Sequence, residues 1–131
     1  MYSLVIKQIY ANSFKFEFST LNKKFDLIFV DGDHSYNAVK SDTANVFKLL
    51  RNENSVIVWH DYGYNPEKPR YSTIAGILDG LPEEARNYVY HVSNTMCAIY
   101  TKKSFNSVII DPPTYPEKTF SIKLSIVSNE K

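Results

Sequence analysis

Two short apolar runs, each ending in acidic and histidine side chains, limit what this chain can fold into. Residues 25–30 read Phe-Asp-Leu-Ile-Phe-Val and run directly into Asp-Gly-Asp-His at 31–34. Residues 56–59 read Val-Ile-Val-Trp and run into His-Asp at 60–61. Such runs are typical of strands covered on both faces, as in a parallel sheet. We therefore predict two buried strands, each followed directly by polar side chains.

The segment between the two runs has the period of an amphipathic helix. Apolar side chains recur at spacings of three and four from residue 36 to residue 50, which is the pattern of one apolar helix face. Ser35 is the predicted N-cap, and Asn-Glu-Asn at 52–54 is the predicted end. A strand, a helix and a strand in this order form a βαβ unit, whose right-handed crossover makes the two strands parallel. The polar residues after both strands are then expected at one sheet edge, where open α/β sheets bind ligands.

The rest of the chain gives weaker patterns. An earlier strand is expected over residues 5–10, and residues 14–18 alternate as a strand or an extended loop would. A loop with two prolines precedes a short helix expected over 72–81. The remaining predicted strands are 87–92, 96–101 and an edge strand within 120–127. We expect an α/β domain over residues 1–103, followed by a proline-rich tail over 104–131.

Composition narrows the class of protein. The net charge of +1 comes without a run of Lys or Arg, which argues against nucleic acid or a membrane surface as the partner. No segment resembles a signal peptide or a membrane span. The chain has one cysteine, Cys97, so no disulfide within the chain is expected, and a cytoplasmic location is the default.

Asp31, His60 and Asp61 are the candidate metal ligands. Two carboxylates and an imidazole suit Mg²⁺, Mn²⁺ or another divalent ion better than a structural zinc. Asp33 or His34 is the candidate general base beside such a site. The same residues also have ordinary structural interpretations, as turn residues, a helix N-terminal charge and a hydrogen-bonded histidine. A metal-dependent hydrolase built on these side chains is a further alternative.

A second motif lies in the tail. Residues 107–118 contain an apolar strand followed by Asp-Pro-Pro, which resembles the catalytic loop of methyltransferases that act on amino groups of nucleic-acid bases. Thr114 separates the second proline from the aromatic Tyr115, and the motif lies near the end of the sequence. We interpret it as a proline-rich turn.

The segments Phe-Asp-Leu-Ile-Phe-Val-Asp-Gly-Asp-His-Ser-Tyr and Ser-Val-Ile-Val-Trp-His-Asp-Tyr-Gly together resemble the C-terminal half of class I S-adenosylmethionine-dependent methyltransferases. The most similar branch is that of macrocin-type sugar O-methyltransferases and related small-molecule enzymes. The resemblance covers about residues 5–103. It implies a partial Rossmann-like sheet, strands three to seven of the family, mostly parallel with an antiparallel end.

The resemblance also implies roles for individual residues. The resemblance implies three cofactor-binding positions: Asn12 and Ser13, which fall near the adenine of S-adenosylmethionine, and Asp31, which follows the fourth strand. Metal-dependent members hold Mg²⁺ at the positions of Asp31, His60 and Asp61, although the family usually has two acids or Asp-Asn at the last two. The ion would hold a hydroxyl of a small-molecule substrate, and Asp33 or His34 would complete its deprotonation.

One family feature is absent from the sequence. Class I methyltransferases bind the cofactor with a glycine-rich loop after the first strand, whereas none of the four glycines here forms a G-x-G. We therefore expect a truncated or fragmentary O-methyltransferase, with an exposed sheet edge covered in a homodimer or by another partner. The alternative is a degenerate, non-catalytic methyltransferase-like domain that serves as a binding or interaction module.

Overall fold

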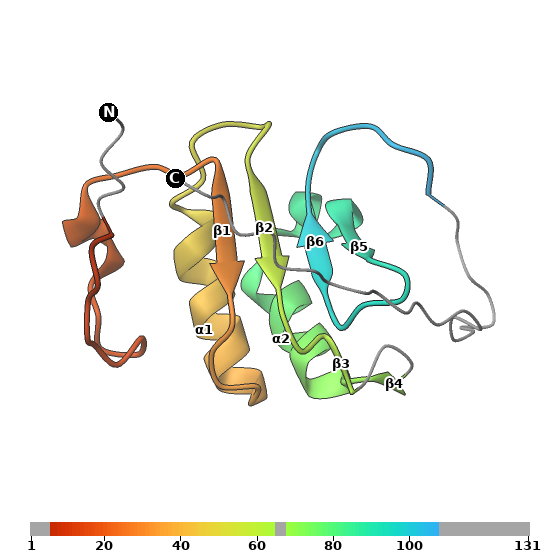
Figure 1. Ribbon diagram of the computed structural model, residues 1–131, viewed down its shortest axis with the longest axis horizontal. Helices are drawn as coiled ribbons and strands as arrows, with labels where there is room; N and C mark the ends of the chain where they lie inside the picture. Colours follow the sequence, from red (N-terminus) through yellow and green to blue (C-terminus); the bar gives the residue numbers. More distant parts are fainter. Residues whose placement is uncertain (1–5, 65–67, 108–131) are drawn as a thin grey trace, which may run out of the picture.

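Four strands form an open sheet in the order β1-β2-β6-β5 in the computed structural model of the chain, which describes residues 6–64 and 68–107 (Figure 1). The strands are β1 (Leu27–Val30), β2 (Val56–Trp59), β5 (Val89–His91) and β6 (Ala98–Tyr100). β1 and β2 are parallel, whereas β6 is antiparallel to both of its neighbours. The predicted α/β class, with an antiparallel end to the sheet, is confirmed.

Two helices cover one face of this sheet. α1 (Tyr36–Phe47) connects β1 to β2, and α2 (Tyr71–Gly80) precedes β5; both lie behind the strands in Figure 1. The predicted helices are confirmed, the first with shorter bounds and the second shifted by one residue, and the strands around residues 90 and 99 are confirmed with shorter bounds. Between the helices and the sheet lie the buried apolar side chains of the core: Val39, Val46, Ile57, Trp59, Ile77, Leu81, Ala85, Ala98 and Tyr100.

The two helices approach each other closely because α2 presents glycines to α1. A Cβ added at Gly76 would lie 2.8 Å from Val39 Cβ and 2.9 Å from the Tyr36 carbonyl oxygen. A Cβ at Gly80 would lie 2.7 Å from Thr43 Cβ. Real Cβ atoms do not approach other atoms so closely, so these positions admit only hydrogen.

Smaller elements complete the described fold. β3 (Gly63–Tyr64) and β4 (Lys68–Pro69) pair in a short antiparallel ribbon, where the sequence predicted only a loop. Two 3₁₀ helices span Phe18–Leu21 and Glu83–Tyr88. No helix in the described part of the chain has the length and apolar character needed to cross a membrane.

The prediction that the strand at residues 25–30 is covered on both faces is wrong. Exposure alternates along β1, and the side chains of Leu27 and Phe29 are 63% and 58% exposed, whereas those of Ile28 and Val30 pack against the core. The cause is the one-sided placement of α1 and α2. An apolar run therefore does not by itself imply helices on both faces.

The strand predicted over residues 5–10 is also not found. Residues 6–10 have no regular structure and are exposed, including Ile6 at 88%, while Val5 lies outside the described residues. A strand requires a neighbour for its backbone groups, and none of the described strands pairs with this segment. Residues 14–18 form a turn and the start of a 3₁₀ helix instead of a strand. The tail from residue 108 onward, with its predicted edge strand and Asp-Pro-Pro motif, lies outside the described residues.

Candidate functional site

The candidate metal ligands meet where β1 and β2 end. Val30 and Trp59 are partners in the parallel ladder, so the residues that follow them, Asp31 and His60, lie side by side. Asp61 completes the group. One ligand atom from each of the three side chains lies within 4.8 Å of the other two. The predicted convergence at the carboxyl ends of neighbouring strands is therefore found in the structure.

Asp61 lies at the centre of this group of side chains. Its Oδ2 is 3.0 Å from His60 Nδ1 and 3.1 Å from His34 Nε2, and His60 Nδ1 is also 3.4 Å from Asp31 Oδ1. The structure thus adds His34, one of the two predicted bases, to the predicted ligands. We call Asp31, His34, His60 and Asp61 the strand-end cluster.

The backbone at Asp61 is left-handed, with φ at 56°. This conformation is uncommon for residues other than glycine, and Asp and Asn tolerate it best. It turns the chain from the end of β2 toward β3. Local strain of this kind occurs at sites whose surroundings fix the geometry, and here it accompanies the most central carboxylate of the strand-end cluster.

The donor atoms fit a divalent cation. Asp31 and Asp61 offer carboxylate oxygens and His60 offers an imidazole nitrogen, a set that suits Mg²⁺, Mn²⁺ and similar ions. His60 Nδ1 is buried, and no described group is aligned with it for a hydrogen bond, although Asp61 Oδ2 is near. A buried nitrogen without such a partner is costly unless a ligand satisfies it, and a bound cation would do so.

Asp33, the other predicted base, has a different place. Its Oδ1 accepts a hydrogen bond from the backbone N–H of Ser35 at 2.6 Å, and hydrogen bonding by Ser35 holds the pKa of Asp33 below its ordinary value. The predicted N-cap position at Ser35 is confirmed, but its side chain makes no capping bond. Asp33 therefore stabilises the turn into α1, and a carboxylate of lowered pKa is a weak proton acceptor.

The residues predicted near the adenine lie beside a buried acid. Asn12 Oδ1 accepts a hydrogen bond from Phe14 N at 2.9 Å, and Ser13 lies next to the Asp42 side chain of α1. The same carboxylate approaches Gly32 from the other side, where an added Cβ would lie 3.2 Å from Asp42 Oδ2. Asp42 thus links the segment around Ser13 to the loop that follows Asp31.

Sequence analysis did not select Asp42, which is buried with 8% of its surface exposed. Burial raises its pKa, the Ser13 side chain lowers it in part, and the charge of Asp33 raises it further. Its Oδ1 has no hydrogen-bond partner among the described residues. The signal was present in the sequence, because Asp42 lies three residues after Val39 and four before Val46 on the buried helix face.

Tyr62 and Tyr64 follow the strand-end cluster in the chain, and both rings contact other side chains. The Tyr62 ring stacks on His91 with centroids 5.4 Å apart, and burial raises the pKa of Tyr62. Tyr64 carries the Arg70 guanidinium 4.0 Å above its ring. The contact with His91 of β5 holds Tyr62 against the sheet, whereas Tyr64 contacts the residue that follows β4.

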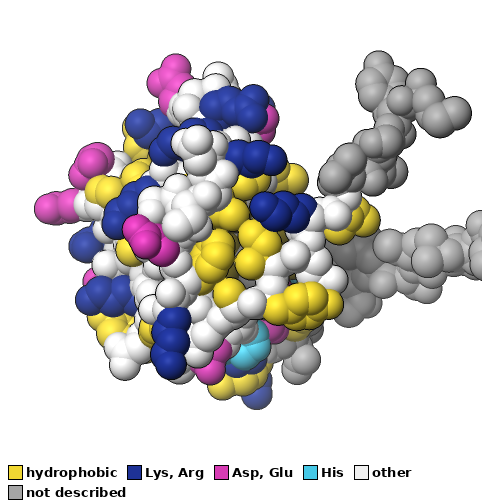
Figure 2. Space-filling view, turned by 90° about the vertical axis from the view of Figure 1, so that its left-hand side faces the viewer, with side chains coloured by type: hydrophobic (Ala, Val, Ile, Leu, Met, Phe, Trp, Pro, Cys, Tyr) yellow, Lys and Arg dark blue, Asp and Glu magenta, His cyan; other side chains and the backbone are white. Residues whose placement is uncertain are grey.

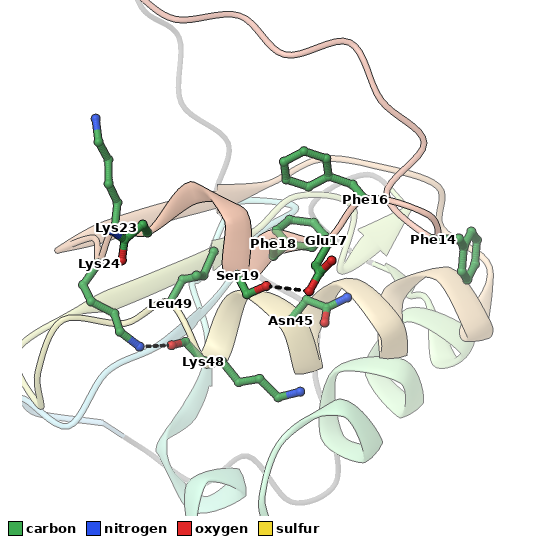
Figure 3. A pocket seen from close by; sticks show the side chains of 11 residues that line it. Phe14, Phe16, Glu17, Phe18, Ser19, Lys23, Lys24, Asn45, Lys48 and Leu49 are labelled. Atoms are coloured by element: carbon green, nitrogen blue, oxygen red, sulfur yellow. Dashed lines mark hydrogen bonds between the residues drawn. The ribbon is translucent and has the colours of Figure 1, made fainter.

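A cavity of about 690 Å³ lies elsewhere (Figure 3). Its walls are the segment before β1 and the last turns of α1, at the opposite end of β1 from the strand-end cluster, none of whose members lines it. Figure 3 shows aromatic and lysine side chains around it and a hydrogen bond from Lys24 Nζ to the Lys48 carbonyl oxygen. This cavity and the strand-end cluster are therefore separate.

Comparison with known proteins gave one match. Residues 2–62, just under half of the chain, match a family described as a methyltransferase domain. This range contains β1, α1 and β2 and ends just after the strand-end cluster. No curated protein and no solved structure matched the chain. The match supports a methyltransferase domain in this protein, in agreement with the class expected from the sequence.

Proposed function

We propose that this chain supplies the substrate-binding and metal-binding part of an S-adenosylmethionine-dependent methyltransferase that methylates a hydroxyl of a small molecule. The observation that carries the proposal is the convergence of Asp31, His60 and Asp61 at the ends of the two parallel strands. A methyltransferase match that ends just after these strands supports the same assignment.

The three ligands divide between the two strands. Asp31 would hold a divalent ion from β1, and His60 and Asp61 would hold it from β2. When bound, such an ion lowers the pKa of a substrate hydroxyl. The chain's own contribution is to fix these donors in place, because the parallel pairing of Val30 with Trp59 sets the distance between them.

His34 is the base that the geometry supports. Its Nε2 lies 3.1 Å from Asp61 Oδ2, so we propose that the neutral ring carries its proton on Nε2, facing this carboxylate, and keeps a lone pair on Nδ1. Nδ1 then accepts the proton of the substrate hydroxyl, and the Asp61 carboxylate stabilises the resulting imidazolium. Its bond to Ser35 and its lowered pKa make Asp33 the weaker candidate for this role.

The cofactor contacts assigned to this chain are partial. Asn12 and Ser13 are proposed to lie near the adenine, next to Asp42 and the loop after β1. The sequence contains no G-x-G loop to hold the rest of the cofactor. The proposal therefore gives this chain the acceptor side of the reaction and part of the cofactor contacts, so we expect weak but measurable binding of S-adenosylhomocysteine by the chain alone.

The first test is calorimetric titration of the chain with Mn²⁺ and then with S-adenosylhomocysteine. We expect one Mn²⁺ per chain, weakened about tenfold or more in His60→Ala because one of three ligands is lost. Asp26→Asn is the matched control, since it removes an exposed acid at the other end of β1, and it should leave Mn²⁺ affinity unchanged.

Two outcomes would refute different parts of the proposal. If His60→Ala binds Mn²⁺ with the same affinity as the native chain, the proposed metal site is refuted. If titration with S-adenosylhomocysteine gives only the heat of dilution, with or without Mn²⁺, a non-catalytic binding module becomes the better interpretation.

A further inference from the structure

The cavity at the start of β1 has no part in the proposed methyl transfer. Its volume of about 690 Å³ lies within the range of pockets that hold one small molecule. One wall comes from the segment before β1 and the other from the end of α1, and the strand-end cluster lies at the opposite end of β1. The cavity therefore calls for a ligand of its own.

Backbone hydrogen bonds hold the two walls together. Phe25 N donates to the Leu49 carbonyl oxygen at 2.9 Å, and Arg51 N donates to the Phe25 carbonyl oxygen at 3.1 Å. Lys24 Nζ adds a hydrogen bond to the carbonyl oxygen of Lys48, the C-cap of α1 (Figure 3). These bonds fix the walls in the absence of a ligand, so less ordering is needed when one binds.

The charged side chains that line the cavity favour an anion. They are three lysines and one glutamate: Lys23, Lys24, Lys48 and Glu17. Glu17 Oε1 already accepts a hydrogen bond from Ser19 Oγ at 3.0 Å. Lys23 and Lys48 are exposed, and no carboxylate in the described part of the chain forms an ion pair with either of them. Figure 2 views this side of the molecule and shows hydrophobic side chains bordered by basic and acidic ones.

The uncharged part of the lining favours a flat ring with polar edges. Phe14 is 58% exposed, and Phe16 and Phe18 are half-buried with their rings edge to face, 5.1 Å between centroids. Accessible faces of aromatic side chains stack on planar bases. The amides of Asn22 and Asn45 also line the cavity, and they offer donors and acceptors to the edge of such a base. An aliphatic chain would leave these amides without partners.

We propose that this cavity binds a nucleoside phosphate, with the base against the phenylalanine rings and the phosphate groups at Lys23 and Lys48. A lysine ammonium is a compact charge on a flexible stem and is a common phosphate ligand. Figure 3 shows these two lysines extending from different sides of the cavity. Phosphate alone would leave the rings unused, and a nucleoside alone would leave the lysines unpaired, so binding requires both parts of the ligand.

Calorimetric titration of the full chain with ADP tests the site. The buffer contains EDTA, so that no metal ion at the strand-end cluster can hold the phosphates. We expect a dissociation constant on the order of 100 μM for ADP, and affinities weaker by about tenfold or more for adenosine and for inorganic phosphate. Equal affinities for ADP and adenosine, or no binding at about 1 mM ADP, would overturn the proposal.

Two variants separate the roles of charge and ring. Lys48→Gln should weaken ADP binding about fivefold and leave adenosine unchanged, with Lys40→Gln as control, because Lys40 is an exposed lysine of α1 that does not line the cavity. Phe14→Leu should weaken both ligands about fivefold, with Tyr71→Leu as control, since Tyr71 is an exposed aromatic residue of α2. Effects no larger than those of the controls would contradict the assignment of these side chains.

Amide chemical shifts locate the ligand. ADP should shift the resonances of residues 14–24 and 45–49, which contain the lining residues, and leave those of residues 31–34 and 60–61 unchanged. S-adenosylhomocysteine should not displace ADP. Displacement, or shifts confined to the strand-end cluster, would assign nucleotide binding to the methyl-transfer site and refute a separate one.

Discussion

At the scale of single residues, the most informative side chain outside the strand-end cluster is Asp42. It combines burial, a raised pKa and an oxygen without a hydrogen-bond partner among the described residues. Such a carboxylate is expensive to keep charged inside a protein. It lies at the point where Ser13 and Gly32 both approach α1, and so connects the N-terminal segment to the loop after β1.

Asp42→Asn should stabilise the protein at neutral pH. Because the folded-state pKa is raised above the unfolded one, the native carboxyl contributes stability below its ordinary pKa of 3.8, which is lost as the pH rises through the raised value. Removing the charge should increase the free energy of unfolding at pH 7 by about 1 kcal/mol and leave it nearly unchanged at pH 3.

Urea unfolding at both pH values measures the effect, with the exposed-loop variant Glu53→Gln as control. If Asp42→Asn were equally destabilising at both pH values, hydrogen bonds to the side chain rather than its charge would decide its contribution.

The positions of the candidate site residues were predictable from the sequence only where topology determines them. Asp31, His60 and Asp61 follow two strands whose parallel pairing follows from the βαβ pattern, so their convergence could be derived. The different contacts of Asp33 and His34 could not be derived in this way, because they depend on loop conformation. One backbone N–H, that of Ser35, engages Asp33 and leaves His34 to Asp61.

At the scale of elements, the contact between α1 and α2 is set by the two glycines on α2. Their missing side chains let the helices approach until only hydrogen fits between Gly76 and the Val39 side chain. This close approach brings the start of α2 to the loop after β1, where Thr73 Oγ1 lies 3.5 Å from the His34 carbonyl oxygen. Helix packing thus supports the position of a candidate site residue.

Gly76→Ala should destabilise the fold, although alanine is the better helix former. The new methyl group would meet the Tyr36 carbonyl and Val39 within 3.0 Å and force the helices apart, at a cost of about 2 kcal/mol. Thermal or urea unfolding measures this, with Ser72→Ala on the exposed face of α2 as control. A Gly76→Ala chain as stable as the control would show that the helices can separate without penalty.

Element types could be predicted from periodicity, but the face on which an element packs could not. The spacing of apolar side chains in α1 and the apolar runs of β1 and β2 gave correct elements. The same runs gave the wrong environment for β1, because strand composition does not tell how many helices are available to cover the sheet. The ribbon of β3 and β4 was missed because strands of two residues carry no detectable period.

At the scale of the whole molecule, burial falls into two zones. β2 lies inside the sheet with Ile57 and Trp59 fully buried, whereas the segment from residue 6 to residue 17 is largely exposed and without regular structure. Amide hydrogen exchange should therefore be slowest in β2 and in the middle of α2, and fastest over residues 6–17.

Exchange followed by mass spectrometry of peptic fragments checks this distribution. Strong protection over residues 6–10 would contradict the structure and restore the strand that the sequence predicts there.

The position of Trp59 has a practical consequence. It is the chain's single tryptophan, 1% exposed, and its Nε1 donates a hydrogen bond to Thr43 Oγ1 on α1 at 3.0 Å. Its indole therefore reports by its own emission whether α1 is seated on the sheet, without an added label. The next residue along the chain is His60, so the same chromophore lies within quenching range of any paramagnetic ion held at the end of β2.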